Sequence, residues 1–389
     1  ATTAGLNNDN ITIQGNTIMR ASYGIYAFGT VFNSTGGLDN WLVTGNTFGP
    51  STYSATDNIG YNGIYISNHI NPTISNNTFQ NIGLTTLASQ VVGIGFASNV
   101  SGATVTQNTI QNLTSTYTGT TTGMNCGIML LTNSINCSIT RNNISGITNN
   151  GGSLYSGRGI TVSTGNASSN LLIANNMIYN ITGGGYLSPT YWVSGIAIES
   201  TTGGVKIYDN TISLSGSFAG YNGSSGSACI SNSSTSFNID IRDNILSNTY
   251  DNTTVTTDKG YAIYNTATNN SSFSNINYND YYVASPNVLG YLSADRATLS
   301  AMQAAFGGNT NSINVSPTFV SSTNLHLQAV AANAAFISGT PLTASVSNDY
   351  DGTTRSVTTT VIGAHEVNIP TCSSITAGTI TQSSSICVS

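Results

Sequence analysis

The sequence predicts an all-β protein, a right-handed parallel β-helix solenoid of about nine coils with a C-terminal cap that contains one short helix. Three observations predict this class: an asparagine phrase that returns at nearly constant spacing, a Gly-Ile phrase in step with it, and apolar residues that alternate within short segments. A regular spacing of this kind is typical of repeat proteins, in which each unit buries its apolar side only by stacking on the next.

The first phrase is aliphatic–x–x–Asn–x–apolar, as in Ile13, Asn16 and Ile18, and its asparagines are separated by 30, 31, 31, 34, 34, 34, 34 and 35 residues. An asparagine at one turn of every coil tolerates left-handed backbone angles and bonds to nearby main chain. At a strand spacing of about 4.8 Å its amide can also donate to the next one. We expect a structural ladder, with turn formation alone as the alternative; its members would be Asn16, Asn46, Asn77, Asn108, Asn142, Asn176, Asn210, Asn244 and Asn279.

The second phrase begins a short strand in each coil. It runs from Gly24-Ile25 to Gly195-Ile196 and then weakens to Ala228-Cys229 and Ala262-Ile263. Apolar residues alternate after it, as in Ile64 and Ile66, which indicates strands and not helices. Parallel stacking of such units would bury the aliphatic columns in one continuous core.

The composition argues against two classes of function, nucleic-acid binding and membrane spanning. The chain has 389 residues, 6% of them charged, and a formal net charge of −6. Eight Lys and Arg residues without a basic cluster argue against nucleic-acid binding, which needs many phosphate contacts. No apolar run approaches the roughly 20 residues that span a bilayer. A polar, weakly charged chain with no signal peptide at its start suggests a mature or partial segment of a longer extracellular protein.

The five cysteines predict no metal site, and no cofactor is expected. Cys137 and Cys229 take slots that hold aliphatic residues in other coils, so both should be buried. A disulfide between Cys126 and Cys137 stays open, as does one between Cys372 and Cys387 in the tail.

Longer inserts fall mostly at one place in the repeat, after the asparagine strand and before the next Gly-Ile, and should gather on one edge of the solenoid, often the binding edge. They span 49–62, 84–91, 115–125, 149–157, 183–193, 216–226 and 249–259. Their aromatic residues could contact surface glycans or other surface proteins. The alternative, favoured for most of them, is that the rings cover coil edges. The candidate ligand-binding residues are Tyr117, Tyr155, Tyr186, Tyr191, Trp192 and Tyr221.

Three regions follow from these patterns: coils over 1–282, a capping region over 283–368, and a tail over 369–389. Within the cap, residues 293–306 show helical spacing of apolar residues, with Ser293 as a helix N-cap and Gly307 as a stop. A cap is needed because an open solenoid end exposes strand edges.

The charged residues of the late coils are the candidates for a catalytic site. Asp209 and Asp243 share one slot of adjacent coils, and Lys206 and Asp240 share another, with Arg242 and Glu199 nearby. Stacking would bring Lys206 against Asp240 and Asp209 near Asp243. We expect surface charge pairs of little energetic value, with a catalytic or cation-binding patch as the alternative.

The three histidines, His69, His326 and His365, lie outside this group, so no catalytic residue is assigned. Ice binding is a third class. Outward Thr and Ser residues form a short column that then breaks at Leu172 and Ala174; its members are Thr73, Ser75, Thr104, Thr106, Ser138 and Thr140.

The repeated phrase resembles the right-handed parallel β-helix family, the pectin-lyase-like fold. The runs 311–319, 325–327, 349–355 and 362–366 resemble the C-terminal capping segment of large bacterial surface β-helix proteins, although Val361 stands where that segment usually has Asp. The tail between Cys372 and Cys387 is similar to the opening strand of Ig-like repeats in Bacteroidota cell-surface proteins exported by the type IX system.

These resemblances imply adhesion or surface structure. We expect a non-catalytic extracellular segment of a cell-surface adhesin or filament-like protein. Its partners would be surface glycans, other surface proteins and the secretion machinery, but neither nucleic acid nor a membrane span. The alternative is a polysaccharide-active lyase or glycosidase on the same scaffold.

Overall fold

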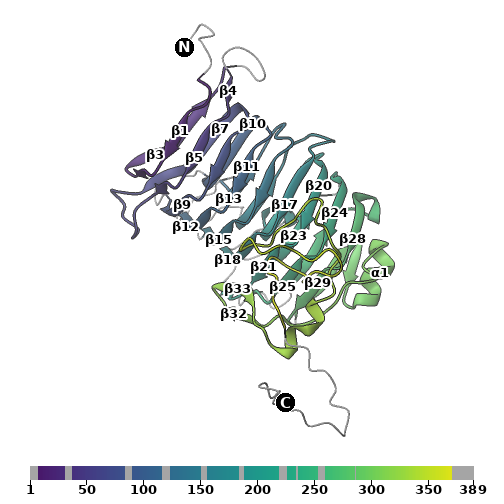
Figure 1. The fold of residues 1–389 in the computed structure, drawn as a ribbon. Helices are drawn as coiled ribbons and strands as arrows, with labels where there is room; N and C mark the ends of the chain where they lie inside the picture. Colours follow the sequence, from purple (N-terminus) through teal and green to yellow (C-terminus); the bar gives the residue numbers. More distant parts are fainter. Residues whose placement is uncertain are drawn as a thin grey trace.

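The computed structural model describes residues 8–30, 37–83, 90–115, 123–149, 156–183, 188–218, 226–233, 235–252, 259–284 and 286–369. They form a parallel β-solenoid with three long sheets, here called A, B and C (Figure 1). Each turn contributes one strand to each sheet in the order A, B, C, and each strand pairs in parallel with the strand of the next turn. The predicted fold class, a parallel β-helix, is confirmed.

Sheet A contains β1 (Thr12–Gln14), β5 (Leu42–Thr44), β8 (Thr73–Ser75), β11 (Thr104–Thr106), β14 (Ser138–Thr140), β17 (Leu171–Ala174), β20 (Gly203–Tyr208), β24 (Phe237–Arg242) and β28 (Phe273–Asn277). Sheet B contains β2 (Thr17–Ile18), β6 (Thr47–Phe48), β9 (Thr78–Ile82), β12 (Thr109–Ser115), β15 (Asn143–Asn149), β18 (Met177–Gly183), β21 (Thr211–Leu214), β25 (Ile245–Asn248) and β29 (Asp280–Val283).

Sheet C contains β3 (Ala21–Phe28), β7 (Ile59–Ile70), β10 (Val91–Ser101), β13 (Asn125–Leu130), β16 (Gly157–Val162), β19 (Val193–Ile198), β23 (Ser227–Asn232), β27 (Gly260–Asn265), β30 (Val288–Leu292) and β31 (Ala294–Arg296), with β4 (Leu38–Asp39) beside β7. Two small pairs complete the strands: β22 (Ser217–Phe218) with β26 (Asp251–Asn252), and β32 (Phe319–Ser321) with β33 (Asn324–Leu327).

Sheets A and B have nine strands each in the described chain. The first two strands of sheet B, β2 and β6, are only two residues long. Nine less two leaves seven turns whose sheet B strands have four residues or more, slightly fewer than the nine coils predicted. The parallel pairing of sheet C continues to β30, inside the region that the sequence pattern assigns to the cap.

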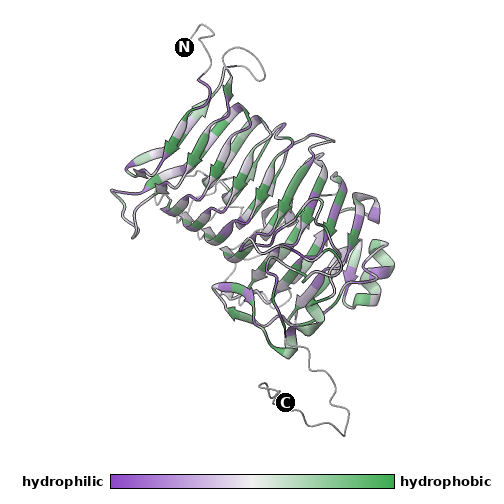
Figure 2. Cartoon of the chain, in the orientation of Figure 1, coloured by the Kyte–Doolittle hydropathy of each residue, from purple (hydrophilic) through white to green (hydrophobic). Residues whose placement is uncertain are grey.

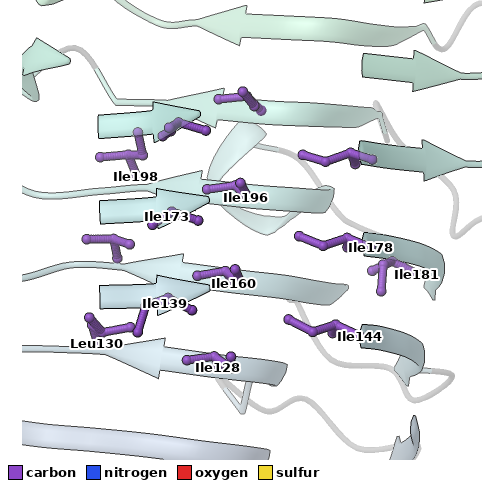
Figure 3. Packing of buried hydrophobic residues seen from close by; sticks show 14 of the residues in the cluster. Ile128, Leu130, Ile139, Ile144, Ile160, Ile173, Ile178, Ile181, Ile196 and Ile198 are labelled. Carbon is purple, nitrogen blue, oxygen red and sulfur yellow. The ribbon is translucent and has the colours of Figure 1, made fainter. Parts of the chain in front are cut away.

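The core is built from columns of equivalent residues. Ile139 of sheet A is in register with Ile173, and Ile173 with Ile207. Ile128, Ile160 and Ile196 stack in the same way in sheet C, as Figure 3 shows. Because identical slots stack at strand spacing, each aliphatic side chain packs on its own equivalent, and the core extends through the solenoid. Along the strands, apolar and polar residues alternate (Figure 2).

The glycine of the Gly-Ile phrase is required by close packing between sheets C and B. A Cβ atom added at Gly127 would lie 2.5 Å from a side-chain carbon of Ile144 and 2.7 Å from the carbonyl oxygen of Gly159. The late coils correct one alignment: Ile230, and not Cys229, pairs with Ile196 and Ile263. Cys229 therefore occupies the glycine slot, where it is fully buried.

The cap differs in detail from the prediction. The helix α1 spans Leu299–Phe306, with Thr298 as N-cap and Gly307 in the left-handed conformation as C-cap. Ser293 is not the cap, because residues Ala294–Arg296 form β31, which turns back antiparallel on β30. Two of the apolar residues at helical spacing, Met302 and Phe306, lie in the solenoid core. Three short 3₁₀ helices are also present: η1 (Pro189–Tyr191), η2 (Asn270–Ser272) and η3 (Ala331–Phe336).

After α1 the chain returns along the solenoid (Figure 1, yellow). This returning segment, residues 309–369, covers the corner between sheets A and B. Leu342 and Val346 pack on Tyr208 of sheet A, while Leu325 and Ala364 pack on sheet B. It reaches back as far as Arg141, whose Nε donates to the carbonyl oxygen of Tyr350 (2.7 Å).

Candidate functional site

The asparagine phrase forms a buried ladder at the corner between sheets A and B. Asn142 Nδ2 donates to Asn176 Oδ1 (2.9 Å) and to the carbonyl oxygen of Val105 in the preceding turn (3.0 Å). Its Oδ1 accepts from the side chain and the main chain of Asn108. Links of this kind run without interruption from Asn16 to Asn279. The ladder is a structural device that fixes the register of neighbouring turns.

The cap closes this ladder. Asn279 N donates to Ser312 Oγ (3.0 Å), and Ile313 forms a parallel bridge with Asp280. The Asn-Ser-Ile run therefore acts as one further rung, with a hydroxyl in place of the amide. A second, partly exposed ladder joins Asn68, Asn99, Asn133 and Asn166 at the corner between sheets C and A. Sequence reasoning missed this ladder, because its asparagines are not flanked by a constant aliphatic pattern.

In the described chain, the end of each sheet B strand and the start of the next sheet C strand lie at one corner of the solenoid, and the predicted inserts fall between these points in the sequence. Four candidate ligand-binding residues, Tyr117, Tyr155, Tyr186 and Tyr221, lie outside the described residues. Tyr191 ends η1 and is half-buried, whereas the Trp192 side chain is buried.

Trp192 belongs to an aromatic group on the outer face of sheet C in the late turns. Its ring is parallel to that of Tyr261 at 6.1 Å and meets Tyr264 edge-on at 4.9 Å. Tyr264 in turn stacks on Tyr291 at 4.5 Å. Trp192 thus covers the sheet here, in line with the alternative that insert aromatics protect coil edges.

An exposed aromatic cluster occupies the other end of the same face. Tyr23, Tyr26 and Phe28 of β3 meet Tyr61 and Tyr65 of β7, with ring centroids 4.5–6.2 Å apart. Tyr26 is 58% exposed and Phe28 42% exposed. Exposed apolar groups of this kind mark contact sites on soluble proteins. We call these five residues the aromatic cluster.

Strand register and one glycine build the cluster. Tyr26 and Tyr65 are direct partners across β3 and β7, and Gly95 follows as the partner of Tyr65. A Cβ atom at Gly95 would lie 2.7 Å from the Tyr65 ring, so glycine lets that ring lie over the next strand. The signal that could have found the cluster is the i, i+2 spacing of Tyr26 and Phe28, which puts both rings on one face of a strand.

The charge patch of the late turns is not the predicted pair of surface contacts. Lys206 and Asp240 are backbone neighbours, as expected. The Asp240 carboxylate, however, is held by Arg242 (2.7 Å) and by the hydroxyl of Tyr208 (2.6 Å). Glu199 lies apart, at the end of sheet C, where it pairs with the buried Arg158 (2.9 Å).

Asp209 and Asp243 are fully buried under the returning segment, which corrects the expectation of a surface pair. Arg355 from that segment contacts Glu366 Oε1 (2.7 Å) and Asp209 Oδ1 (3.4 Å). Asp243 Oδ1 accepts from the main-chain nitrogen of Thr340 (2.9 Å). Sequence spacing could not show this, because the covering segment lies more than 90 residues away along the chain.

Burial raises the pKa of both Asp209 and Asp243. Although burial dominates at Asp209, its direct contact with Arg355 favours the ionised form there. Arg355 contacts Asp209 and Glu366, whereas Asp243 has no direct cation contact, so burial and the neighbouring Asp209 both raise the pKa of Asp243. Because the returning segment covers both aspartate carboxyl groups, a polymeric substrate cannot reach them in the folded chain.

Cys126, Cys137 and Cys229 are buried free thiols, so the Cys126–Cys137 disulfide does not form; Cys372 and Cys387 lie outside the described residues.

In the described part of the chain, one group of three side chains has the arrangement of metal ligands: His326, Asp351 and His365. These three lie in the returning segment, whereas the aromatic cluster lies on sheet C of the first two turns.

The column proposed for ice binding lies in register on β8, β11 and β14. Some of its hydroxyl groups bond to one another, as between Thr140 and Thr106 (3.1 Å).

No helix within the described residues has the length and apolar character to cross a membrane.

Comparison with known proteins gives no match to a family model, to a curated protein or to a solved structure. The assignment of the chain therefore rests on its own geometry, which is that of a parallel β-helix consistent with the pectin-lyase-like fold.

Proposed function

We propose that this chain is a non-catalytic, extracellular segment of a cell-surface adhesin and that it binds glycans through the aromatic cluster. The observation that carries the proposal is the group of five rings on the outer face of β3 and β7, two of them strongly exposed. The resemblance of the capping runs to bacterial surface β-helix proteins supports the surface location, and the resemblance of the tail to Ig-like repeats of type IX-exported proteins supports export by that system.

Glycans fit the chemistry of this face better than a charged partner does. The faces of aromatic rings carry partial negative charge and attract the partly positive C–H groups of a sugar ring. Only 6% of the chain is charged, while Asn, Ser and Thr supply neutral donors and acceptors for sugar hydroxyl groups. Two parallel strands hold the rings in place, so binding requires little ordering of the protein.

The non-catalytic part of the proposal is supported by the position of the acidic residues. Glycoside hydrolysis uses two carboxyl groups that flank the scissile bond. Asp209 and Asp243 are buried beneath the returning segment, whose Arg355 contacts Asp209 directly. The Asp240 carboxylate is occupied by Arg242 and Tyr208.

A glycan array probed with the full chain tests the proposal. The variants Tyr26→Ala and Phe28→Ala remove the two most exposed rings, and exposed positions tolerate substitution within about 0.5 kcal/mol. Each variant should weaken binding by about ten-fold, which corresponds to about 1.4 kcal/mol. Tyr53→Ala is the matched control, because Tyr53 is 43% exposed but belongs to the insert before β7. Absence of glycan binding, or equal loss in the control, would refute the assignment.

A further inference from the structure

Two histidines and one aspartate from three separate stretches of the cap converge on one point. His326 lies in β33, Asp351 in the turn after Asp349, and His365 just beyond Gly363. His326 Nε2 is 3.0 Å from Asp351 Oδ2, and His365 Nε2 is 3.8 Å from the same oxygen. One ligand atom from each residue can be chosen so that all three lie within 4.8 Å of one another.

These separations suit a small divalent cation. Zinc binds histidine nitrogen and carboxylate oxygen at about 2.0–2.2 Å. In a tetrahedral site, ligand atoms at that distance from the metal are roughly 3.3–3.6 Å from each other. The two His–Asp351 separations, 3.0 and 3.8 Å, lie on either side of this range. Shifts of a few tenths of an ångström, about the scale of these differences, would bring both separations into the tetrahedral range.

Neighbouring groups already orient the ligands. His326 Nδ1 is hydrogen-bonded to Asn324 Oδ1, which assigns the proton to Nδ1 and directs Nε2 toward Asp351. Asp349 Oδ1 accepts from the main-chain nitrogens of Asp351 (3.0 Å) and Thr353 (2.7 Å), which shapes the turn that presents Asp351. Metal-ligating histidines generally donate their other ring N–H to a neighbouring oxygen in this way.

The residues beside the two histidines are packed against sheet B, whereas Asp351 is exposed to solvent. Leu325 and Ala364, adjacent to the two histidines, are buried against Met177 and Tyr179 of sheet B. The Asp351 side chain is 45% exposed, so water or a further ligand can reach the cation. Two histidines and one carboxylate with open positions are a ligand set of divalent transition metals.

We propose that His326, Asp351 and His365 form a binding site for a divalent transition metal ion, with zinc as its tested occupant. The ion joins β33 to the turn at 349–352 and to the run 362–366, and so fastens the cap across the outer face of sheet B. This site is independent of the proposed glycan function, since the aromatic cluster lies on another sheet of the first turns.

Isothermal titration of the metal-stripped full chain with zinc chloride tests the site. One zinc ion should bind per chain. His326→Gln, His365→Gln and Asp351→Asn should each weaken zinc binding at least ten-fold. Asp57→Asn, which removes a partly exposed carboxylate paired with Arg20, should change it less than two-fold. Zinc should raise the melting temperature of the wild-type chain but not that of the His326→Gln/His365→Gln double variant.

X-ray absorption at the zinc edge of the wild-type chain supplies a readout that does not depend on the folding of any variant. Two imidazole ligands and at least one carboxylate or water oxygen are expected. The proposal fails if zinc does not bind at equimolar ratio, if the ligand variants bind as the wild type does, or if the spectrum shows sulfur or fewer than two imidazoles. A bare hydrogen-bonded His–Asp–His group would give the first of these results.

Discussion

Substitution of Asn142 by alanine removes one rung from the centre of the buried ladder. The Asn142 side chain makes four full hydrogen bonds: its two N–H groups donate to Asn176 Oδ1 and Val105 O, with Thr140 O as a shared third acceptor, and its Oδ1 accepts from the main-chain and side-chain nitrogens of Asn108. Both Asn108 nitrogens would lose this acceptor in a region with no solvent access. The perturbation therefore breaks contacts to the turns on either side of the rung.

The magnitude follows from the number of bonds. A buried hydrogen bond contributes about 1 kcal/mol net, and an unsatisfied buried donor costs about 1–3 kcal/mol. Four lost bonds give about 4 kcal/mol of lost unfolding free energy, among the larger effects of a single substitution. Urea denaturation followed by circular dichroism measures it, with comparison of the slopes to detect unfolding of only part of the solenoid.

Asn166→Ala is the matched control. Asn166 is half-buried in the second ladder, where its side chain donates to Asn133 Oδ1 and accepts from the main-chain nitrogen of Ser168. Loss of these solvent-accessible bonds should cost about 1 kcal/mol. If Asn142→Ala destabilises the chain no more than this control, the buried ladder does not fix the register and the reasoning is wrong.

Three further predictions concern the glycine column and the cap. Gly127→Ala should lower the unfolding free energy by about 1–3 kcal/mol, measured by urea denaturation, because the added Cβ meets Ile144 and a main-chain oxygen. Arg355→Met should leave buried carboxylates unpaired, cost about 3–5 kcal/mol, and expose the returning segment to limited proteolysis. Since burial raises the pKa of Asp243, the folded state holds a proton that the unfolded state releases above about pH 4. Stability should therefore fall as pH rises toward that raised pKa, and Asp243→Asn should reduce the fall in melting temperature.

Each of these has a contrary outcome. An unchanged urea midpoint for Gly127→Ala would show that sheets B and C are less closely packed than described. Arg20→Met, in an exposed pair with Asp57, should cost at most about 1 kcal/mol, and equal protease resistance of the two arginine variants would contradict the role of Arg355. A melting temperature of Asp243→Asn with the same pH dependence as the wild type would show that Asp243 is ionised in the fold.

The fold could be predicted from the sequence because the same pattern of apolar residues and asparagine occurs in nine successive coils. Each coil repeats the same slots for Ile139, Asn142 and Gly127, so the register of one pair fixes the register of the others. The alignment error at Cys229 arose where the Gly-Ile phrase weakens and no local signal replaces it. The start of α1 was misplaced because Ser293 and Thr298 are both favoured N-cap residues; Thr298 caps the helix, and residues between them form β31.

The candidate sites were harder to predict because they depend on contacts between distant segments. Asp209 looks like an exposed polar residue in its own coil and becomes buried only when Arg355 folds back over it. His326 in β33 and His365 in the irregular run after Gly363 meet because the cap folds back on itself, and no repeat spacing relates the two residues. Tyr26 and Phe28 follow ordinary strand alternation in β3, but the sequence prediction assigned ligand binding to the aromatic residues of the inserts.

The central claim, that the aromatic cluster binds glycans on a scaffold that performs no chemistry, is tested most directly by one titration. The glycan that binds best on the array is added to the wild-type chain and to Tyr26→Ala, and the same samples are then checked for shortened or unsaturated products. We predict saturable binding by the wild type, about ten-fold weaker binding by the variant, and intact glycan in both. Product formation by the wild type, or equal affinity of the two proteins, would contradict the account.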